Sequence, residues 1–220
     1  MKKFFVIAAM LLAGFTASAQ VNIGAGYMWD FWSAKNGNNK AAGGYSLNGV
    51  YAGVSYNIKL VEGLGIAPGA YFSWATGNVL NSEGKKLVDS PNASWKASHM
   101  ALTIPVHLTY MAELGPGGFF AYLGPAFQYG LSLKETISGS VPDLELGGSA
   151  TGDNLFKKDN NGNRVNTPFD VKLGVGFGYN WKFIQANVGF DWGFLDRNAN
   201  KDDNYKQHAN AVHAGIAFVF

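Results

Sequence analysis

The sequence predicts an all-β protein, an eight-stranded antiparallel up-and-down β-barrel that crosses a membrane. Three observations predict it. Apolar residues recur at every second position in eight separate runs, the period of a strand with two unlike faces. The connections between the runs alternate between short and long, as in a meander of antiparallel strands. After residue 20 no apolar run reaches the roughly 20 residues of a membrane-spanning helix, so a chain that enters a membrane must do so as a closed barrel.

The first segment has the composition of a secretory signal peptide. Two lysines precede an apolar run (residues 4–15), and Ala-Ser-Ala at 17–19 supplies the small-residue cleavage site. The apolar run is too short for a transmembrane anchor. We therefore expect residues 1–19 to be removed on export. Residues 20–220 are expected to form a single barrel domain, because no linker or break in composition divides them.

Composition excludes several classes of protein. Glycine accounts for 29 of the 220 residues, about twice its usual share, and 15% of the residues are charged against roughly 25% in an average domain. This combination disfavours a helical enzyme. The chain has no cysteine, which excludes disulfides, cysteine metal sites and a lipidated N-terminal cysteine. Loss of the two signal-peptide lysines lowers the formal net charge from +2 to 0, so the charge indicates no nucleic-acid partner.

The predicted strands share one pattern. In the run 168–180, apolar residues occupy the odd positions from Phe169 to Tyr179, with Asp170, Lys172 and glycines between them. A helical period does not fit, and glycine occurs too often for stable helices. The predicted strands are 21–32, 45–58, 63–76, 97–111, 118–133, 168–180, 183–195 and 209–220. The short connections are 59–62, 112–117 and 181–182, and the long polar ones are 33–44, 77–96, 134–167 and 196–208.

The two faces of these strands differ in size as well as polarity. One face is large and apolar, whereas the other is mostly Gly, Ala, Ser, Thr and Asn with isolated charges. Small residues suit the crowded interior of a narrow barrel, and large apolar residues suit an exterior that contacts lipid. We therefore predict that the apolar face points outward into lipid.

The ends of the predicted strands are rich in aromatic residues, as expected at the two interfaces of a membrane. The last strand must pair with the first, because an open edge in lipid would leave backbone groups unsatisfied. The aromatic residues expected at the long-loop end are Trp29, Trp32, Trp74, Trp95 and Trp192. Those expected at the short-turn end are Tyr56, Tyr110, Phe119, Tyr179, Trp181 and Phe220.

The chain resembles the outer-membrane β-barrel domain (porin-like) proteins common in Bacteroidetes and, more broadly, the eight-stranded OmpA/OmpX-type barrels. The resemblance is carried by "LTIPVHLTYM" (102–111), "FFAYLGPAFQYGLS" (119–132), "FDVKLGVGFGYNWKFIQANVGFDWGFLD" (169–196) and the closing aromatic residue. It implies a location in the bacterial outer membrane. It also implies that Phe218 and Phe220 form a terminal signal read by the barrel-insertion machinery. The family shares no catalytic residues, so the resemblance implies no activity.

Isolated charges fall on the predicted inner face. If Trp181 and Lys182 form a two-residue turn, Lys172 faces Asp191 across the last-but-one hairpin. We predict that these two residues form a buried ion pair, since leaving either unpaired inside the barrel would cost several kcal/mol. A gate or a proton path is the alternative role. The predicted interior polar network comprises Lys172, Asp191, Asp170, Asp30, His107 and His213.

Other chemistry-bearing patterns have structural explanations. His99, His107 and His213 come from strands on roughly opposite sides of the predicted barrel, which favours separate hydrogen-bonded residues over a zinc site. The alternating glycines of "LGVGFGYN" lie inside a strand, whereas a nucleotide-binding loop leads into a helix. The segment "KDNNGNRVN" lacks the glycine spacing of an EF-hand calcium loop. We expect no cofactor, no metal and no catalytic site.

Function is therefore expected in the four long loops, with both termini and the short turns in the periplasm. The first hypothesis is a non-enzymatic role in envelope structure or surface interaction, in which the loops bind an extracellular or envelope partner. The alternatives are a narrow passive pore for small solutes, an outer-membrane lipid-modifying enzyme, and a soluble periplasmic lipocalin-like binder with its faces reversed. An eight-stranded barrel is usually filled, which disfavours the pore, although small inner residues leave room for water. The longest loop carries four apolar residues that can pack over the rim or against a partner: Leu144, Leu146, Leu155 and Phe156.

Overall fold

The computed structural model describes residues 19–37, 43–90, 92–139, 149–160, 162–200 and 204–220, and its regular structure there consists of β-strands. Within these ranges, no helix is long and apolar enough to span a membrane. The signal segment before residue 19 lies outside the described ranges, as do Leu144 and Leu146. The strands are β1 (Ala19–Asn36), β2 (Gly44–Val61), β3 (Leu64–Leu80), β4 (Ala93–Leu114), β5 (Gly117–Gly139), β6 (Ser149–Thr151), β7 (Phe169–Trp181), β8 (Ile184–Gly193) and β9 (Tyr205–Val219).

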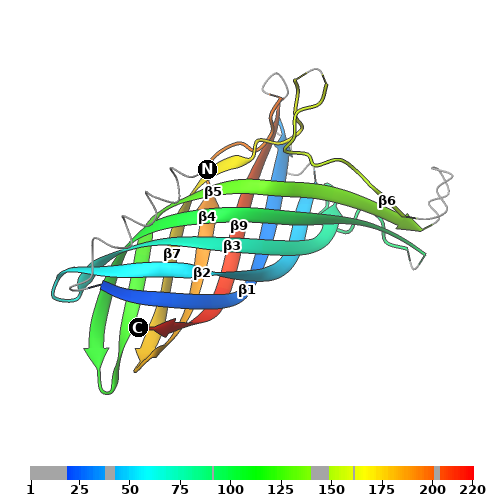
Figure 1. Cartoon of the computed structure of the whole chain (residues 1–220). Helices are drawn as coiled ribbons and strands as arrows, with labels where there is room; N and C mark the ends of the chain where they lie inside the picture. Colours follow the sequence, from blue (N-terminus) through cyan, green and yellow to red (C-terminus); the bar gives the residue numbers. More distant parts are fainter. Residues whose placement is uncertain (1–18, 38–42, 91, 140–148, 161, 201–203) are drawn as a thin grey trace.

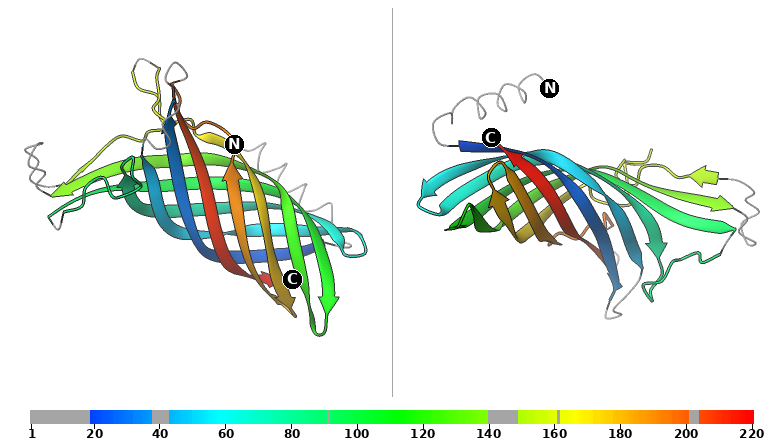
Figure 2. Two further views of the ribbon diagram at one scale, coloured as in Figure 1. Left: turned by 180° about the vertical axis from the view of Figure 1, so that it is seen from behind. Right: turned by 90° about the horizontal axis from the view of Figure 1, so that it is seen from below.

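Eight of these strands form a closed antiparallel ring. Each pairs with the next along the chain, from β1 to β5 and then β7, β8 and β9, and β9 returns to β1. Figure 1 shows β2 to β5 across the near wall, and Figure 2 shows the opposite wall from behind. The remaining strand, β6, is three residues long and pairs only with the outer end of β5. The predicted eight-stranded up-and-down barrel is confirmed; β6, within the predicted loop 134–167, was not predicted.

The ring closes where the sequence requires it, between the last strand and the first. Val219 of β9 pairs with Asn22 of β1. The final residue continues the ladder, because Phe220 N donates to Val21 O at 2.9 Å and Val21 N donates to Phe220 O at 3.1 Å. No strand of the ring is left with an open edge along this seam, which explains why the apolar alternation runs to the last residue.

The two ends of the barrel are unlike. Tight turns at 62–63, 115–116 and 182–183 join strands at one end, and the long connections lie at the other. Strands β4 and β5 have 22 and 23 residues. That is about twice the 9–11 residues that a strand needs to cross a bilayer. They therefore project past the ring at the long-loop end and carry β6, as Figure 1 shows.

Side chains alternate between buried and exposed along the strands, most regularly in β5. The large apolar residues are on the exposed side, as predicted, and the small and polar residues face the interior. The soluble alternative with reversed faces is therefore wrong, because it would place this apolar surface in the interior. Exposed examples from seven of the strands are Ile23, Val50, Phe72, Leu102, Leu123, Phe177 and Ile216.

The aromatic residues at the long-loop end divide between the two faces. Trp29, Trp74 and Trp192 are exposed on the outer face, as an interfacial girdle requires. The prediction is wrong for Trp32, which shares the inner face with the other even positions of β1 and is buried. It is also wrong for Trp95, which packs against the buried interior cluster. These two indoles therefore lie on the inner side of the barrel mouth and not in the lipid-facing girdle.

The hairpin between β7 and β8 has a register that differs from the prediction. The turn consists of Lys182 and Phe183, with φ 55° at Lys182, and Trp181 pairs with Ile184. The turn therefore lies one residue later than expected, which moves every partner on β8 by two positions. Phe183, predicted to begin a strand, instead lies 6.4 Å from the Phe218 ring at the short-turn rim, measured between centroids.

The outward position of Phe190 provides a test of the face assignment. We expect Phe190→Arg to lower the free energy of unfolding in a bilayer by about 2–4 kcal/mol, because the guanidinium would face hydrocarbon. Phe190→Leu, which keeps an apolar side chain there, should cost much less. Reversible denaturant unfolding of the barrel in phospholipid vesicles measures both values. Equal losses for the two variants would contradict a lipid-facing position.

Candidate functional site

The interior of the barrel is divided into three zones along its axis. We call the aromatic zone at the long-loop end the plug, the zone of buried ionised groups below it the charged layer, and the open volume toward the short turns the lower cavity. The plug is built around Trp32, Phe156 and Arg197, all of which are buried. These three zones decide whether anything can pass through the barrel.

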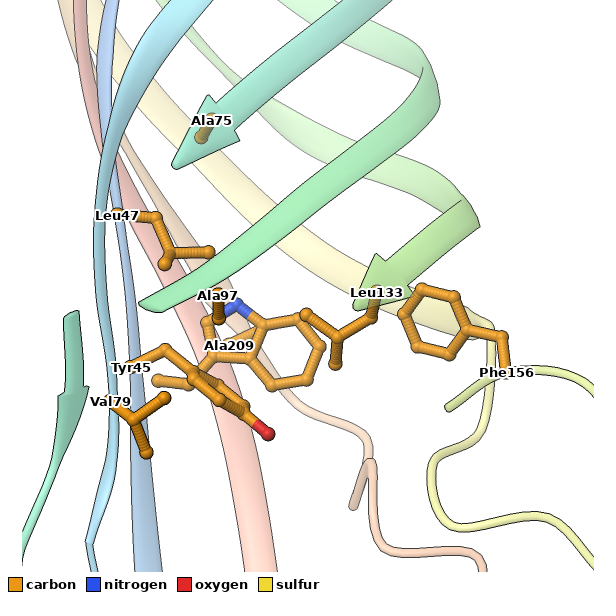
Figure 3. Packing of buried hydrophobic residues seen from close by; sticks show 9 residues of the cluster. Tyr45, Leu47, Ala75, Val79, Ala97, Leu133, Phe156 and Ala209 are labelled. Carbon is orange, nitrogen blue, oxygen red and sulfur yellow. The ribbon is translucent and has the colours of Figure 1, made fainter. Parts of the chain in front are cut away.

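The plug is the main buried apolar cluster of the described residues. Its strand residues come from six strands of the ring, and Phe156 comes from the connection between β5 and β7. Figure 3 shows the side chains converging across the mouth, with the Phe156 ring beside Leu133. The cluster comprises Trp32, Tyr45, Leu47, Ala75, Val79, Ala97, Leu133, Phe156 and Ala209, with Trp95 and Leu155 packed against it.

Phe156 is held inside the mouth by Asn154. The Asn154 side-chain oxygen accepts hydrogen bonds from Leu133 N at 2.9 Å and from Phe156 N at 3.1 Å, and its amide nitrogen donates to Leu131 O at 3.0 Å. Leu155 N also donates to Leu133 O at 2.8 Å. This part of the longest loop is thus bonded to β5 and bends into the barrel, whereas its apolar residues were predicted to pack over the rim or against a partner.

Arg197 completes the plug from the connection between β8 and β9. Its guanidinium carbon lies 4.7 Å from the Trp32 ring centroid and 5.1 Å from that of Phe156, so the cation stacks on both rings. Its Nη1 is 3.7 Å from Asp170 Oδ2. Burial lowers the pKa of the Arg197 guanidinium, and the carboxylates of Asp170 and Asp30 oppose that shift. An arginine stays protonated at physiological pH, so the plug carries a fixed positive charge.

The two loops that supply Phe156 and Arg197 are bonded to each other. Asn166 and Asn198 form an antiparallel bridge, and Thr167 N donates to Arg197 O at 2.8 Å. The Asn166 side chain also donates to Gln207 of β9. Because these contacts tie both loops to the ring, the plug is a packed part of the fold.

The charged layer lies directly beneath the plug. Asp30 accepts a hydrogen bond from Trp32 Nε1 at 3.2 Å, and its second oxygen is 2.7 Å from His99 Nδ1. Lys172 is almost fully buried and lies within electrostatic range of Asp30, Asp170 and Asp191, although its Nζ has no hydrogen-bond partner among the described residues. The layer therefore places Lys172 with two buried carboxylates, Asp30 and Asp170, while Asp191 lies within electrostatic range from the cavity below.

The lower cavity has a volume of about 830 Å³ and extends from the short-turn rim to Asp191. Asp191 Oδ2 is 3.7 Å from His213 Nε2. A methyl group at Gly174 would lie 2.6 Å from His107 Nε2 and 2.9 Å from Asp191 Oδ1, so only glycine leaves room for this pair of side chains. His107 stacks on Tyr122 with centroids 4.7 Å apart.

The residues predicted to form the interior network all come from the inner face, but they occupy two separate zones. Asp30, Asp170 and Lys172 belong to the charged layer, whereas Asp191 and His213 line the lower cavity together with His107. The predicted direct pairing of Lys172 with Asp191 is wrong. With the turn at 182–183, Lys172 pairs with Gly193 and Asp191 with Gly174.

Sequence reasoning did not identify Arg197, the central cation of the plug. It lies in a predicted polar loop, where no strand period indicates which way a side chain points. His99 was expected as a separate hydrogen-bonded interior residue, and it lies against Asp30. Among the residues that the structure describes, no three His, Asp or Glu side chains are placed to hold a metal ion together.

Comparison with known proteins gives a family match. The model of the family described as outer membrane protein beta-barrel domain matches residues 9–197. No curated protein matches the sequence. Solved structures of similar arrangement include a major outer membrane protein from Thermus thermophilus (14% identity, 92% of this chain and 100% of that chain, TM-score 0.49). Another is the attachment invasion locus protein Ail of Yersinia pestis (11% identity, 92% of this chain and 99% of that chain, TM-score 0.46). A third is OprG from Pseudomonas aeruginosa (12% identity, 93% of this chain and 96% of that chain, TM-score 0.45).

Proposed function

The chain belongs to the outer membrane protein beta-barrel domain family, and from this premise we propose that it is a closed, non-enzymatic barrel that acts through its long-loop end. Its location is the bacterial outer membrane, with the apolar outer face in lipid. The proposed role is surface interaction or support of the envelope, in which the projecting β4–β5 ribbon and the loops contact a partner outside the membrane.

One observation carries this proposal: the plug fills the barrel mouth while the longest strands continue past it. Trp32, Phe156 and Arg197 are packed and bonded to the ring, which favours a closed barrel over the passive pore. The outer ends of β4 and β5, with the exposed strand β6, add strand beyond the length needed for the bilayer. Backbone built beyond the membrane serves contacts outside it, since it adds nothing to the span.

Trimming this ribbon tests the proposed role. Gly152 N donates to Glu135 O at 2.9 Å, so the chain ends meet there and a short Gly-Ser turn can replace residues 136–151. We expect the trimmed protein to assemble, with heat-dependent gel migration like the wild type. It should fail to restore surface attachment or resistance to envelope-disrupting agents in a strain that lacks the protein. Full restoration by the trimmed protein would refute a role for the ribbon.

The proposed orientation places the long loops outside the cell and the short turns in the periplasm. Because the chain has no cysteine, single cysteines report it cleanly. Lys158→Cys, in the long connection before β7, should react with a membrane-impermeant maleimide on intact cells. Glu62→Cys, in the turn between β2 and β3, should react only after the outer membrane is broken. The reverse pattern would invert the orientation.

The proposed export signal predicts the N-terminus of the mature protein. We expect the membrane-inserted chain to begin at Gln20, after cleavage behind Ala19. Mass spectrometry of the N-terminal peptide measures this directly. A peptide that begins at Met1 in the assembled protein would contradict cleavage.

A further inference from the structure

The lower cavity has the chemistry of a binding site, and we propose that it takes a small organic ammonium ion that enters from the short-turn end. Its volume of about 830 Å³ lies in the range of sites for small molecules. The plug and the charged layer close it above, so a ligand can enter and leave only past the short-turn rim. In the orientation proposed above, that rim faces the periplasm.

Unpartnered hydrogen-bond acceptors line this cavity. Gln128 and Asn22 are both more than nine-tenths buried, yet Gln128 Oε1 and Asn22 Oδ1 have no partner among the described residues. The Gln128 amide nitrogen already donates to Thr103 Oγ1 at 3.3 Å, which directs its oxygen elsewhere. A buried acceptor without a donor has lost its hydrogen bonds to water without replacement, which destabilises the empty site. A molecule rich in N–H groups would remove that destabilisation.

Among ligands that donate N–H hydrogen bonds, the charge of the cavity lining favours those that are positively charged. The ionised residues along the cavity are three carboxylates, Asp191, Glu62 and Glu113, and one ammonium, Lys59. Asp191 lies at the inner end, 3.7 Å from His213 Nε2, and Lys172 of the charged layer lies within electrostatic range of it. The Asp191 side chain is still 18% exposed, so a positively charged group can reach its carboxylate from the cavity, and the acidic residues at the rim steer cations inward.

Aromatic rings supply the third element of the site. Tyr51 lies between Tyr71 and His213, with centroid distances of 5.9 Å and 5.7 Å. Tyr122 lines the opposite wall, stacked on His107. Proteins bind ammonium groups by cation–π attraction over the faces of such rings, and a carboxylate beside the rings adds an opposite charge. An anion would meet the carboxylates, and a purely apolar molecule would leave the amide oxygens unpaired.

Calorimetric titration of the full-length barrel in lipid nanodiscs tests this proposal with two probes of matched shape. 1,4-Diaminobutane carries two ammonium groups, whereas 1,4-butanediol has the same length and no charge. We expect the diamine to bind and the diol to give no measurable heat. Asp191→Asn should weaken diamine binding about tenfold or more, a loss of about 1.4 kcal/mol per factor of ten. Glu83→Gln removes one carboxylate in an exposed outer loop and should leave binding unchanged.

A second variant keeps the proposal testable if Asp191→Asn does not assemble. Ala67→Phe narrows the cavity without changing its charge and should weaken diamine binding by obstructing the site. Equal binding of the diamine and the diol would show that charge is not recognised. If both cavity variants still bind the diamine as tightly as the wild type, the diamine binds on the outer surface of the barrel. If the wild type does not bind the diamine, the cavity holds only solvent. Each of these results overturns the proposal.

Discussion

Replacing Lys172 with methionine is expected to lower the free energy of unfolding by about 3–5 kcal/mol, the usual cost of leaving a buried charge uncompensated. Lys172 is 1% exposed, and Asp30 and Asp170 beside it are fully buried. Methionine preserves the length and the apolar stem of lysine but removes the cation. Two carboxylates of the charged layer would then share Arg197 and His99 as their remaining partners.

The matched control removes one carboxylate together with the lysine. Lys172→Met combined with Asp170→Asn restores the balance of charge, and we expect it to recover most of the loss, because an isolated buried charge costs more than a neutral pair. Urea unfolding in phospholipid vesicles measures all three variants, including Asp170→Asn alone. If the double variant is as unstable as Lys172→Met, the lysine acts through packing and not through its charge.

The strands and their faces could be predicted because a membrane barrel imposes one repeated rule. A residue that points outward contacts lipid and must be apolar, while its neighbours meet a crowded interior and must be small or polar. Phe169 to Tyr179 obey this rule at every position, so the period is visible without any knowledge of the partners. The assignment of each residue to the inner or outer face stays correct when the register between two strands is wrong by an even number of residues.

The pairing of interior charges could not be predicted in the same way. Lys172 and Asp191 are both on the inner face, but their distance depends on which two residues form the turn. Trp181 and Phe183 are both aromatic and both exposed at the rim, so the pattern alone does not show where the strand ends. The alternation of apolar residues therefore does not decide between a turn at 181–182 and a turn at 182–183, and the strand register follows from that choice.

The plug was beyond sequence reasoning for a different reason. Phe156 and Arg197 lie in connections, where a side chain can point to solvent, to the rim or into the barrel with the same local sequence. What directs them inward is tertiary: Asn154 bonded to β5, and the bridge between Asn166 and Asn198. The prediction also failed for Trp32, although it lies in a strand. It was expected to face lipid because aromatic residues near a strand end are common at the membrane interface, whereas its position on the inner face buries it.

The proposed closure is compatible with the large amount of glycine inside the barrel. Glycines such as Gly174 make the lower half hollow, and the same small residues would leave a continuous water path if they extended to the mouth. Large side chains replace them at the long-loop end and join the strands to two loops. Closure is thus localised in one zone, and a change confined to that zone should open the barrel.

Removing the two plug rings is therefore expected to turn a silent barrel into a conducting one. Trp32→Ala combined with Phe156→Ala deletes the rings that hold the Arg197 guanidinium between them. Each truncation should also cost about 3–5 kcal/mol of stability, as for other buried aromatic residues, so assembly is first checked by heat-dependent gel migration. In planar bilayers we expect the wild type to give no discrete current steps and the double variant to give them.

Trp29→Ala is the matched control, because it removes a tryptophan from the lipid-facing side of the same strand. It should remain silent, since it leaves the plug intact. Current through the wild type would mean that the plug does not seal the mouth and would revive the passive pore. Silence of a well-assembled double variant would move the barrier down to the charged layer, where Lys172 and the carboxylates around it would have to close the path. Current through the double variant would thus assign closure of the barrel to the plug, and silence would assign it to the charged layer. In the second case, the Lys172→Met variant, tested in the same bilayers, would show whether the charged layer blocks ions by its charge or by its size.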